Sequence, residues 1–111
     1  MISNNFVTSA NELPGYRIVR NIGIVRGIVV RSRSIVGTIG AGLQSLFGGN
    51  ITLWSELCEQ TRRDAYGLMS RHAQDAGGNA VVAMRYDTTE IAQGVAEVLA
   101  YGTAVVVEVA K

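Results

Sequence analysis

The stretch that decides the fold is "YRIVRNIGIVRGIVVR", residues 16–31. Its isoleucines and valines fall largely on one face at every second position, which is the period of a β-strand. Gly23 and Gly27 lie on the opposite face. Glycines on one side of a strand indicate a bulge or the close approach of another backbone. We therefore predict one long strand over residues 16–31 that bends near Gly23.

A long helix is predicted over residues 52–76. Thr52 is suited to the N-cap position, and Gly77-Gly78 is a typical helix end. Between them, apolar and small residues recur at helical spacing along one face. The members of this face are Trp54, Leu57, Cys58, Thr61, Ala65, Leu68, Met69, His72 and Ala76.

Two valine-rich segments follow, residues 79–88 and 96–110, joined by a loop at residues 89–95. The order strand, helix, strand, strand predicts an α+β fold: a β-α-β-β chain with a three-stranded antiparallel sheet and one long helix packed on it. A single helix covers only one face of a sheet, yet these strands are apolar on both faces. The uncovered face therefore predicts a homo-oligomer.

The glycine-rich segment "GTIGAGLQSLFGGN", residues 37–50, raises the question of phosphate binding. A Walker A loop needs a lysine within the motif, but the only lysine of this chain is Lys111. The dinucleotide fingerprint needs a third glycine where this chain has Ser45. The spacing of Ile35, Ile39, Leu43 and Leu46 instead predicts a short accessory helix that forms when it docks on other residues.

Length, composition and charge exclude several other classes of protein. The chain has 111 residues, which predicts a single domain over residues 1–111. Its net charge of +1, and arginines without an aromatic stacking platform, argue against nucleic acid as a partner. No apolar run approaches the roughly 20 residues that span a membrane. One cysteine cannot form an internal disulfide, so we expect a cytoplasmic protein.

Several segments together resemble the YbjQ-like family of small bacterial and archaeal proteins, whose description is heavy-metal binding. They are "ELPGY", "IGIVRG", "GLQSLFGGN", "GGNAVVAMRYDT" and "AEVLAYGTAV", in the family's order and over nearly the whole chain. The resemblance implies a ring-shaped homopentamer of β-α-β-β subunits, similar to the dodecin subunit, with short accessory strands such as "NNFVTS". The expected subunit contacts are Phe6, Gly23, Gly27, Ile39, Leu43 and Phe47.

Cys58 is the one candidate ligand for a heavy-metal ion, because it is the only thiol. His72 lies fourteen residues further along the helix, roughly 21 Å away at 1.5 Å per residue, so the two cannot share an ion. A metal site would need donors from neighbouring subunits. The alternative interpretations are a small buried hydrophobe for Cys58 and a polar group at the helix flank for His72.

An enzyme would need a nucleophile with a base, or paired carboxylates. Asp87 and Glu90, with Arg85, are the group to consider, but a solvated turn with local capping bonds is the interpretation that we favour for them. We assign no catalytic and no cofactor-binding residue. The sequence predicts a homopentameric binding or scaffold protein for a heavy metal or another soft ligand. The alternative is an enzyme of unknown reaction with its active site between subunits.

Overall fold

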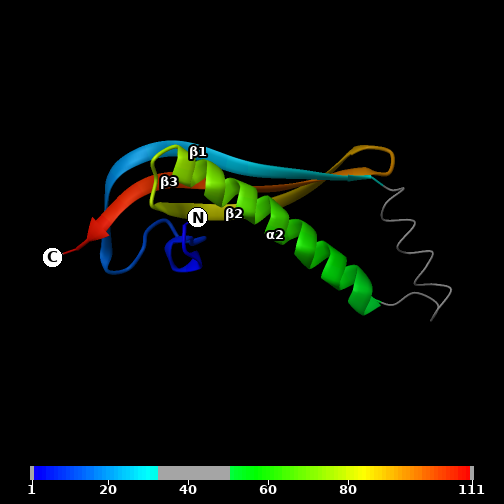
Figure 1. Ribbon diagram of the computed structural model, residues 1–111, viewed down its shortest axis with the longest axis horizontal. Coiled ribbons are helices and arrows are strands. Elements are labelled where there is room, and N and C mark those ends of the chain that lie inside the picture. The colour runs from blue at the N-terminus through cyan, green and yellow to red at the C-terminus, as the bar shows by residue number, and fades with distance from the viewer. Residues whose placement is uncertain (1, 33–50, 111) are drawn as a thin grey trace.

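The computed structural model describes residues 2–32 and 51–110, and of residues 51–54 only the backbone. In chain order its elements are the 3-10 helix η1 (Asn4–Phe6), strand β1 (Tyr16–Ser32), helix α2 (Ile51–Asp75), strand β2 (Ala80–Ala92) and strand β3 (Val95–Val109). The strands form one antiparallel sheet in the order β1-β3-β2, with α2 running across one face (Figure 1). The predicted α+β fold is confirmed. The accessory helix expected around residues 35–47 lies outside the described residues.

Strand β1 is bent as its glycines predict. Its register against β3 shifts between Ile18 and Arg20 and again between Asn21 and Gly23. Gly23 has a φ of +134°, a conformation that side-chain-bearing residues rarely adopt. The glycine therefore allows the bulge, and the bulge bends the strand at the predicted position.

The second glycine of β1, Gly27, marks the place where α2 touches the sheet. A Cβ atom on Gly27 would lie 2.1 Å from the Ala65 carbonyl oxygen, 2.5 Å from the Met69 amide nitrogen and 2.8 Å from the Leu68 Cβ. Two of these three atoms belong to the helix backbone and cannot rotate away. The absence of a side chain at position 27 is therefore what lets the helix approach the strand so closely.

The main core lies between α2 and the sheet. Ala65, Met69 and Ala73 of the helix have no exposed surface there. The strands contribute Val25, Val29, Val81, Met84, Val98, Ala100 and Ala104. Three members of the predicted helix face, Cys58, His72 and Ala76, are exposed. Figure 1 shows α2 moving away from the sheet toward its N-terminal end, whereas Ala73 near its C-terminal end is fully buried. Within residues 2–32 and 51–110 no helix is both long and apolar enough to cross a membrane.

A second, smaller core cluster is assembled around the N-terminal segment. Phe6 and Leu13 pack against Ala80, Val82, Val105 and Val107 of β2 and β3. In β3, Val105 and Val107 alternate with Ala104 of the main core, so their side chains point away from α2. The N-terminal segment thus covers one end of the face that α2 leaves open.

The same segment also protects part of the free edge of β2. The Thr8 amide donates to the Val81 carbonyl at 2.9 Å, and the Met84 amide donates to the Thr8 carbonyl at 3.0 Å. The expected accessory strand at "NNFVTS" is only partly present. Asn4–Phe6 form the 3-10 helix η1, and Val7 alone makes a parallel bridge to Val81.

The β2–β3 connection is shorter than predicted. We expected a loop at residues 89–95, but β2 continues to Ala92 and β3 begins at Val95. Thr89 pairs with Glu97 and Glu90 with Ala96, so the would-be loop is part of the ladder. The composition of residues 89–92 does not predict this pairing, because their hydrogen-bond partners lie on β3.

The contact at Gly27 gives a first testable prediction. Gly27→Ala should destabilise the protein by about 2–3 kcal/mol, because the new methyl group must push the helix backbone off the sheet. Gly67→Ala is the matched control, since a Cβ there meets nothing within 4 Å and the change should stabilise the helix by up to about 1 kcal/mol. Urea unfolding at one fixed protomer concentration measures both. Equal stabilities for the two variants would contradict the close-contact interpretation.

Candidate functional site

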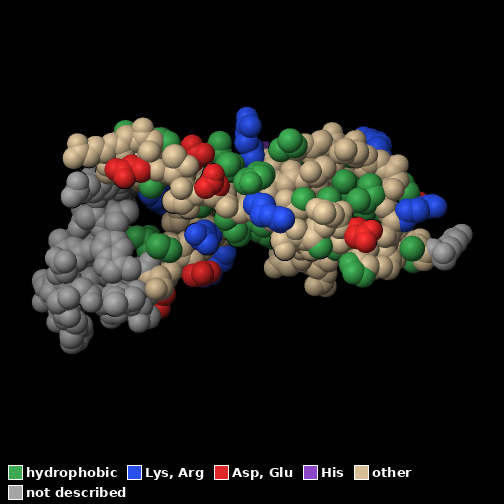
Figure 2. Space-filling model, turned by 180° about the vertical axis from the view of Figure 1, so that it is seen from behind, with side chains coloured by type: hydrophobic (Ala, Val, Ile, Leu, Met, Phe, Trp, Pro, Cys, Tyr) green, Lys and Arg blue, Asp and Glu red, His purple; other side chains and the backbone are tan. Residues whose placement is uncertain are grey.

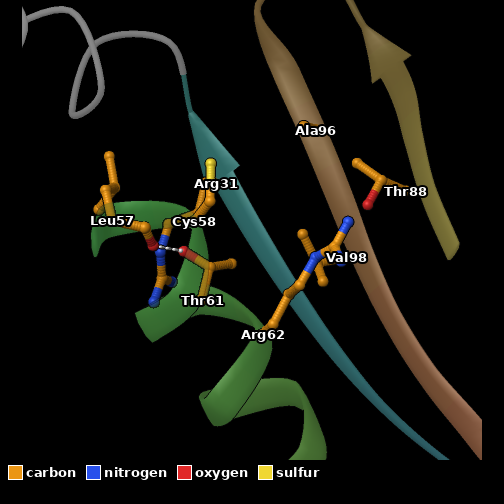
Figure 3. Close-up of a pocket in the computed structure, with 8 residues that line it drawn as sticks. All are labelled: Arg31, Leu57, Cys58, Thr61, Arg62, Thr88, Ala96 and Val98. Atoms are coloured by element: carbon orange, nitrogen blue, oxygen red, sulfur yellow. Dashed lines mark hydrogen bonds between the residues drawn. The ribbon is translucent and has the colours of Figure 1, made fainter. Parts of the chain in front are cut away.

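A cavity lined by described residues lies between the N-terminal half of α2 and the hairpin end of the sheet. Figure 1 shows the helix diverging from the sheet toward its N-terminal end. The cavity has a volume of about 310 Å³. We call it the wedge pocket; its lining residues are Arg31, Leu57, Cys58, Thr61, Arg62, Thr88, Ala96 and Val98 (Figure 3).

The helix supplies one wall of the wedge pocket. Leu57, Cys58, Thr61 and Arg62 fall on one side of α2, since residues four apart lie one above the other on a helix. The Thr61 hydroxyl donates to the Leu57 carbonyl at 2.9 Å, so its proton is already used within the helix. The Cys58 thiol is free and exposed. The expectation that Cys58 is a buried hydrophobe is therefore wrong for this chain.

The sheet supplies the other wall. Arg31 pairs with Ala96 across the β1–β3 ladder, and Thr88 pairs with Val98 across the β2–β3 ladder. Directly paired residues point to the same face of a sheet, and these four point toward α2. All three strands thus contribute to the pocket, although only β3 contributes two residues.

Two arginines give the wedge pocket its charge. An Arg31 guanidinium nitrogen lies 3.0 Å from one carboxylate oxygen of Asp64, and the other oxygen accepts from the Gln60 side chain at 2.9 Å. The Arg62 guanidinium carbon lies 5.5 Å from the centre of the Tyr86 ring, a cation–π contact. The eight lining residues include two arginines and no carboxylate, and the Asp64 carboxylate just outside the lining offsets the charge of Arg31 but not that of Arg62.

The tyrosines beside the pocket do not offset this charge. Burial raises the pKa of the Tyr86 hydroxyl above its ordinary value, with Arg62 acting in the opposite direction. Burial also raises the pKa of Tyr66, whose hydroxyl donates to the Asn4 side-chain oxygen at 2.9 Å. Both phenols are neutral at neutral pH, so they contribute no charge beside the arginines.

His72 lies apart from the wedge pocket, as its distance along the helix predicts. Its Nδ1 is 2.6 Å from the backbone carbonyl oxygen of Arg26, so Nδ1 carries a proton and donates to that carbonyl. The residue is exposed at the flank of α2. The interpretation of His72 as a polar group at the helix flank is confirmed.

The acidic group considered for catalysis makes local hydrogen bonds. Asp87 accepts from the Thr88 amide at 2.9 Å, and Glu90 accepts from the Gly94 amide at 3.2 Å. Arg85 donates to the Ser9 carbonyl at 2.7 Å rather than to either carboxylate. Within this chain, the local capping interpretation accounts for these residues.

Three of the six expected subunit contacts lie within the described residues. Phe6 is half-buried and meets Tyr16 edge to face, with ring centres 5.1 Å apart. Gly27 lies beneath α2 of its own chain, and Gly23 forms the β1 bulge. Their part in contacts between copies stays a prediction. The other three, Ile39, Leu43 and Phe47, lie outside the described residues.

With this geometry in view, the chain can be compared with known proteins. A family model described as "Putative heavy-metal-binding", the YbjQ family, matches residues 5–108. The chain belongs to this family. The resemblance seen in the sequence is thereby confirmed.

Individual relatives of the YbjQ family agree with the family match. A UPF0145 protein of Solibacter usitatus (strain Ellin6076) is 68% identical over 105 residues, covering 95% of this chain and 94% of that protein. A UPF0145 protein of Burkholderia thailandensis is 63% identical over 105 residues, covering 95% of each. A crystal structure of a protein of unknown function from Pediococcus pentosaceus, of the DUF74 family, matches with a TM-score of 0.57 at 17% identity. The structural match covers 93% of this chain and 97% of the Pediococcus pentosaceus chain, and at this identity it supports the fold alone.

The residues of one chain do not fit the heavy-metal site that the YbjQ description implies. Within residues 2–32 and 51–110, no three His, Cys, Asp or Glu side chains gather closely enough to hold an ion. Cys58 lines the wedge pocket together with Arg62, which forms no ion pair among the described residues, and like charge disfavours a cation there. One thiol also leaves most positions of a tetrahedral or trigonal ion unfilled.

Sequence reasoning found one of the eight pocket residues as a site candidate, Cys58. It missed Arg31, Arg62 and Thr88, which come from three different elements and meet only in the folded chain. One signal was available: Arg62 lies four residues after Cys58, so the helical period places both on one side of α2.

The thiol gives the second testable prediction. If Cu(I) or Hg(II) binds, Cys58→Ser should abolish binding, because thiolate is the ligand these soft ions prefer. His72→Ala should leave binding nearly intact, since its ring is engaged with the β1 backbone. Zinc should bind weakly and below one ion per chain. Equilibrium dialysis with metal analysis measures all three, and tight zinc binding that survives Cys58→Ser would show that another set of donors exists.

Proposed function

We propose that this YbjQ-family chain is a subunit of a homopentameric binding or scaffold protein. The observation that carries the proposal is the apolar sheet face opposite α2. On β1, Ile24 is 80% exposed, Ile28 43% and Val30 49%. Side chains this apolar are rarely left in water as a contiguous group unless another surface covers them.

The exposed residues of β1 continue onto β3. Ile28 pairs with Leu99 and Arg26 with Tyr101, so these side chains share the face that points away from α2. Tyr101 is itself 37% exposed. Figure 2, seen from the opposite side to Figure 1, shows hydrophobic side chains at the surface beside charged ones. We call this surface the open face: Ile24, Ile28, Val30, Leu99 and Tyr101.

Charges of both signs surround the open face. Arg26 and Arg85 lie on either side of Tyr101 in the ladder, while Asp87 pairs with Leu99 and Glu97 with Val30. A surface with an apolar centre and a mixed-charge rim suits another copy of the same chain, whose arginines would meet its carboxylates. The number five comes from the YbjQ resemblance.

The binding role rests on the wedge pocket. Its volume of about 310 Å³ lies at the lower end of the range of roughly 300–1,000 Å³ for small-molecule sites. The heavy-metal description of the family leads to a narrower proposal, in which neighbouring subunits add donors to Cys58. The dialysis experiment above tests that proposal separately.

Assembly gives the third testable prediction. The unmodified protein should appear as a pentamer by native mass spectrometry at micromolar protomer concentration. Ile24→Asp should shift the population toward monomer, because the contact would bury a carboxylate that has no partner. Leaving a buried charge unpaired in this way costs about 3–5 kcal/mol. Ile24→Val keeps the apolar character and should remain pentameric.

Circular dichroism separates dissociation from unfolding in this experiment. The Ile24→Asp variant should keep the helical and strand signal of the parent, since Ile24 contributes little to the core of its own chain. A well-folded monomer formed by the unmodified protein would overturn the proposal. So would an Ile24→Asp pentamer as stable as the parent.

A further inference from the structure

We propose that the wedge pocket binds a small organic anion: a carboxylate with a short aliphatic body. The inference deepens the binding role proposed above and rests on it, by naming the class of ligand. It starts from the mismatch between the family's metal description and the residues that line the pocket.

The charge of the pocket favours an anionic group. Arg31 enters from the end of β1 and reaches Asp64 on α2, whereas Arg62 enters from α2 and reaches Tyr86 on β2, so both side chains cross between the two walls. In Figure 3 the Arg62 side chain reaches from the helix toward the strands. A carboxylate between such walls can accept charge-assisted hydrogen bonds from a planar guanidinium, which is the geometry that arginine recognises well.

Both arginines have N–H groups that remain available to donate hydrogen bonds to a ligand. A guanidinium has five N–H donors, and the ion pair of Arg31 with Asp64 joins one nitrogen to one oxygen. Arg62 is held over the Tyr86 ring by a cation–π contact, and no carboxylate within residues 2–32 and 51–110 forms an ion pair with it. The ring fixes the position of the Arg62 charge without neutralising it.

The remaining walls favour an aliphatic body. Leu57, Ala96 and Val98 present only hydrocarbon side chains to the pocket. The Thr61 hydroxyl donates to the Leu57 carbonyl, so it offers no proton to a ligand. Burying a charged head group against these apolar walls is costly, and a single carboxylate brings less charge into the pocket than a divalent phosphate does. We therefore favour a carboxylate with a hydrocarbon chain, and the test below includes the phosphate alternative.

The test uses Cys58 as a reporter of occupancy. It is the only cysteine of the chain and it lines the pocket, so its alkylation by the neutral reagent iodoacetamide is read from the intact assembled protein by mass spectrometry. Octanoate should slow this alkylation in a saturable manner. Acetate tests the carboxylate head group alone, and octanol tests the hydrocarbon chain alone. Hexyl phosphate tests whether a phosphate head group binds instead of a carboxylate.

Variants then connect the protection to the arginines. Arg62→Gln should weaken octanoate binding by about tenfold or more, the loss expected for one charged hydrogen bond. Arg31→Gln should act in the same direction. Arg63→Gln is the matched control, because Arg63 is the next residue on α2, is exposed and does not line the pocket. Its octanoate affinity should equal that of the parent.

The outcomes are separable from the assembly proposal. Circular dichroism and native mass spectrometry show whether each variant stays folded and keeps the parent's subunit number. Failure of octanoate to protect Cys58 in a correctly assembled parent would overturn the ligand class alone. Equal protection by octanol would show that the arginines do not select the ligand, and preferential protection by hexyl phosphate would replace the carboxylate by a phosphate.

Discussion

Where α2 crosses β1, the Ala65 carbonyl and the Met69 amide lie against the Gly27 backbone with no side chain between them. This contact sets the distance between helix and sheet at one point. The helix is straight and the sheet is twisted, so close approach at one point is followed by separation further along. The main core forms around the contact, and the wedge pocket forms where the two elements separate (Figure 1).

The three-stranded sheet has more apolar surface than one chain can cover. Helix α2 covers one face, and Phe6 and Leu13 of the N-terminal segment cover one end of the other. The middle of that second face keeps Ile24 and Ile28 in contact with water. At roughly 25 cal/mol for each Å² of apolar surface removed from water, covering this face gives association a substantial driving force. This is the physical basis for proposing that YbjQ-family chains of this kind work as assemblies.

The pocket chemistry and the family description point to different ligands. A soft metal ion needs several thiolate or imidazole donors, whereas Cys58 has Arg31 and Arg62 as its charged neighbours in the pocket. His72, the other donor of this type, is engaged with the β1 backbone near the opposite end of α2. The proposal of an anion pocket starts from this difference and from the two arginines that line a largely apolar cavity.

The sequence by itself determined the long bent strand, the helix and the order of the elements, because periodicity and the placement of Gly23 and Gly27 are properties of a few neighbouring residues. It also determined that Cys58 and His72 cannot act together, since helix geometry fixes their separation. Only the tertiary structure decided that residues 89–92 continue β2, because their hydrogen-bond partners lie on β3. It also decided that Cys58 is exposed and lines one pocket with Arg31 and Arg62. The tilt of α2 depends on which side chains separate it from the sheet, and those side chains come from segments that are distant in sequence.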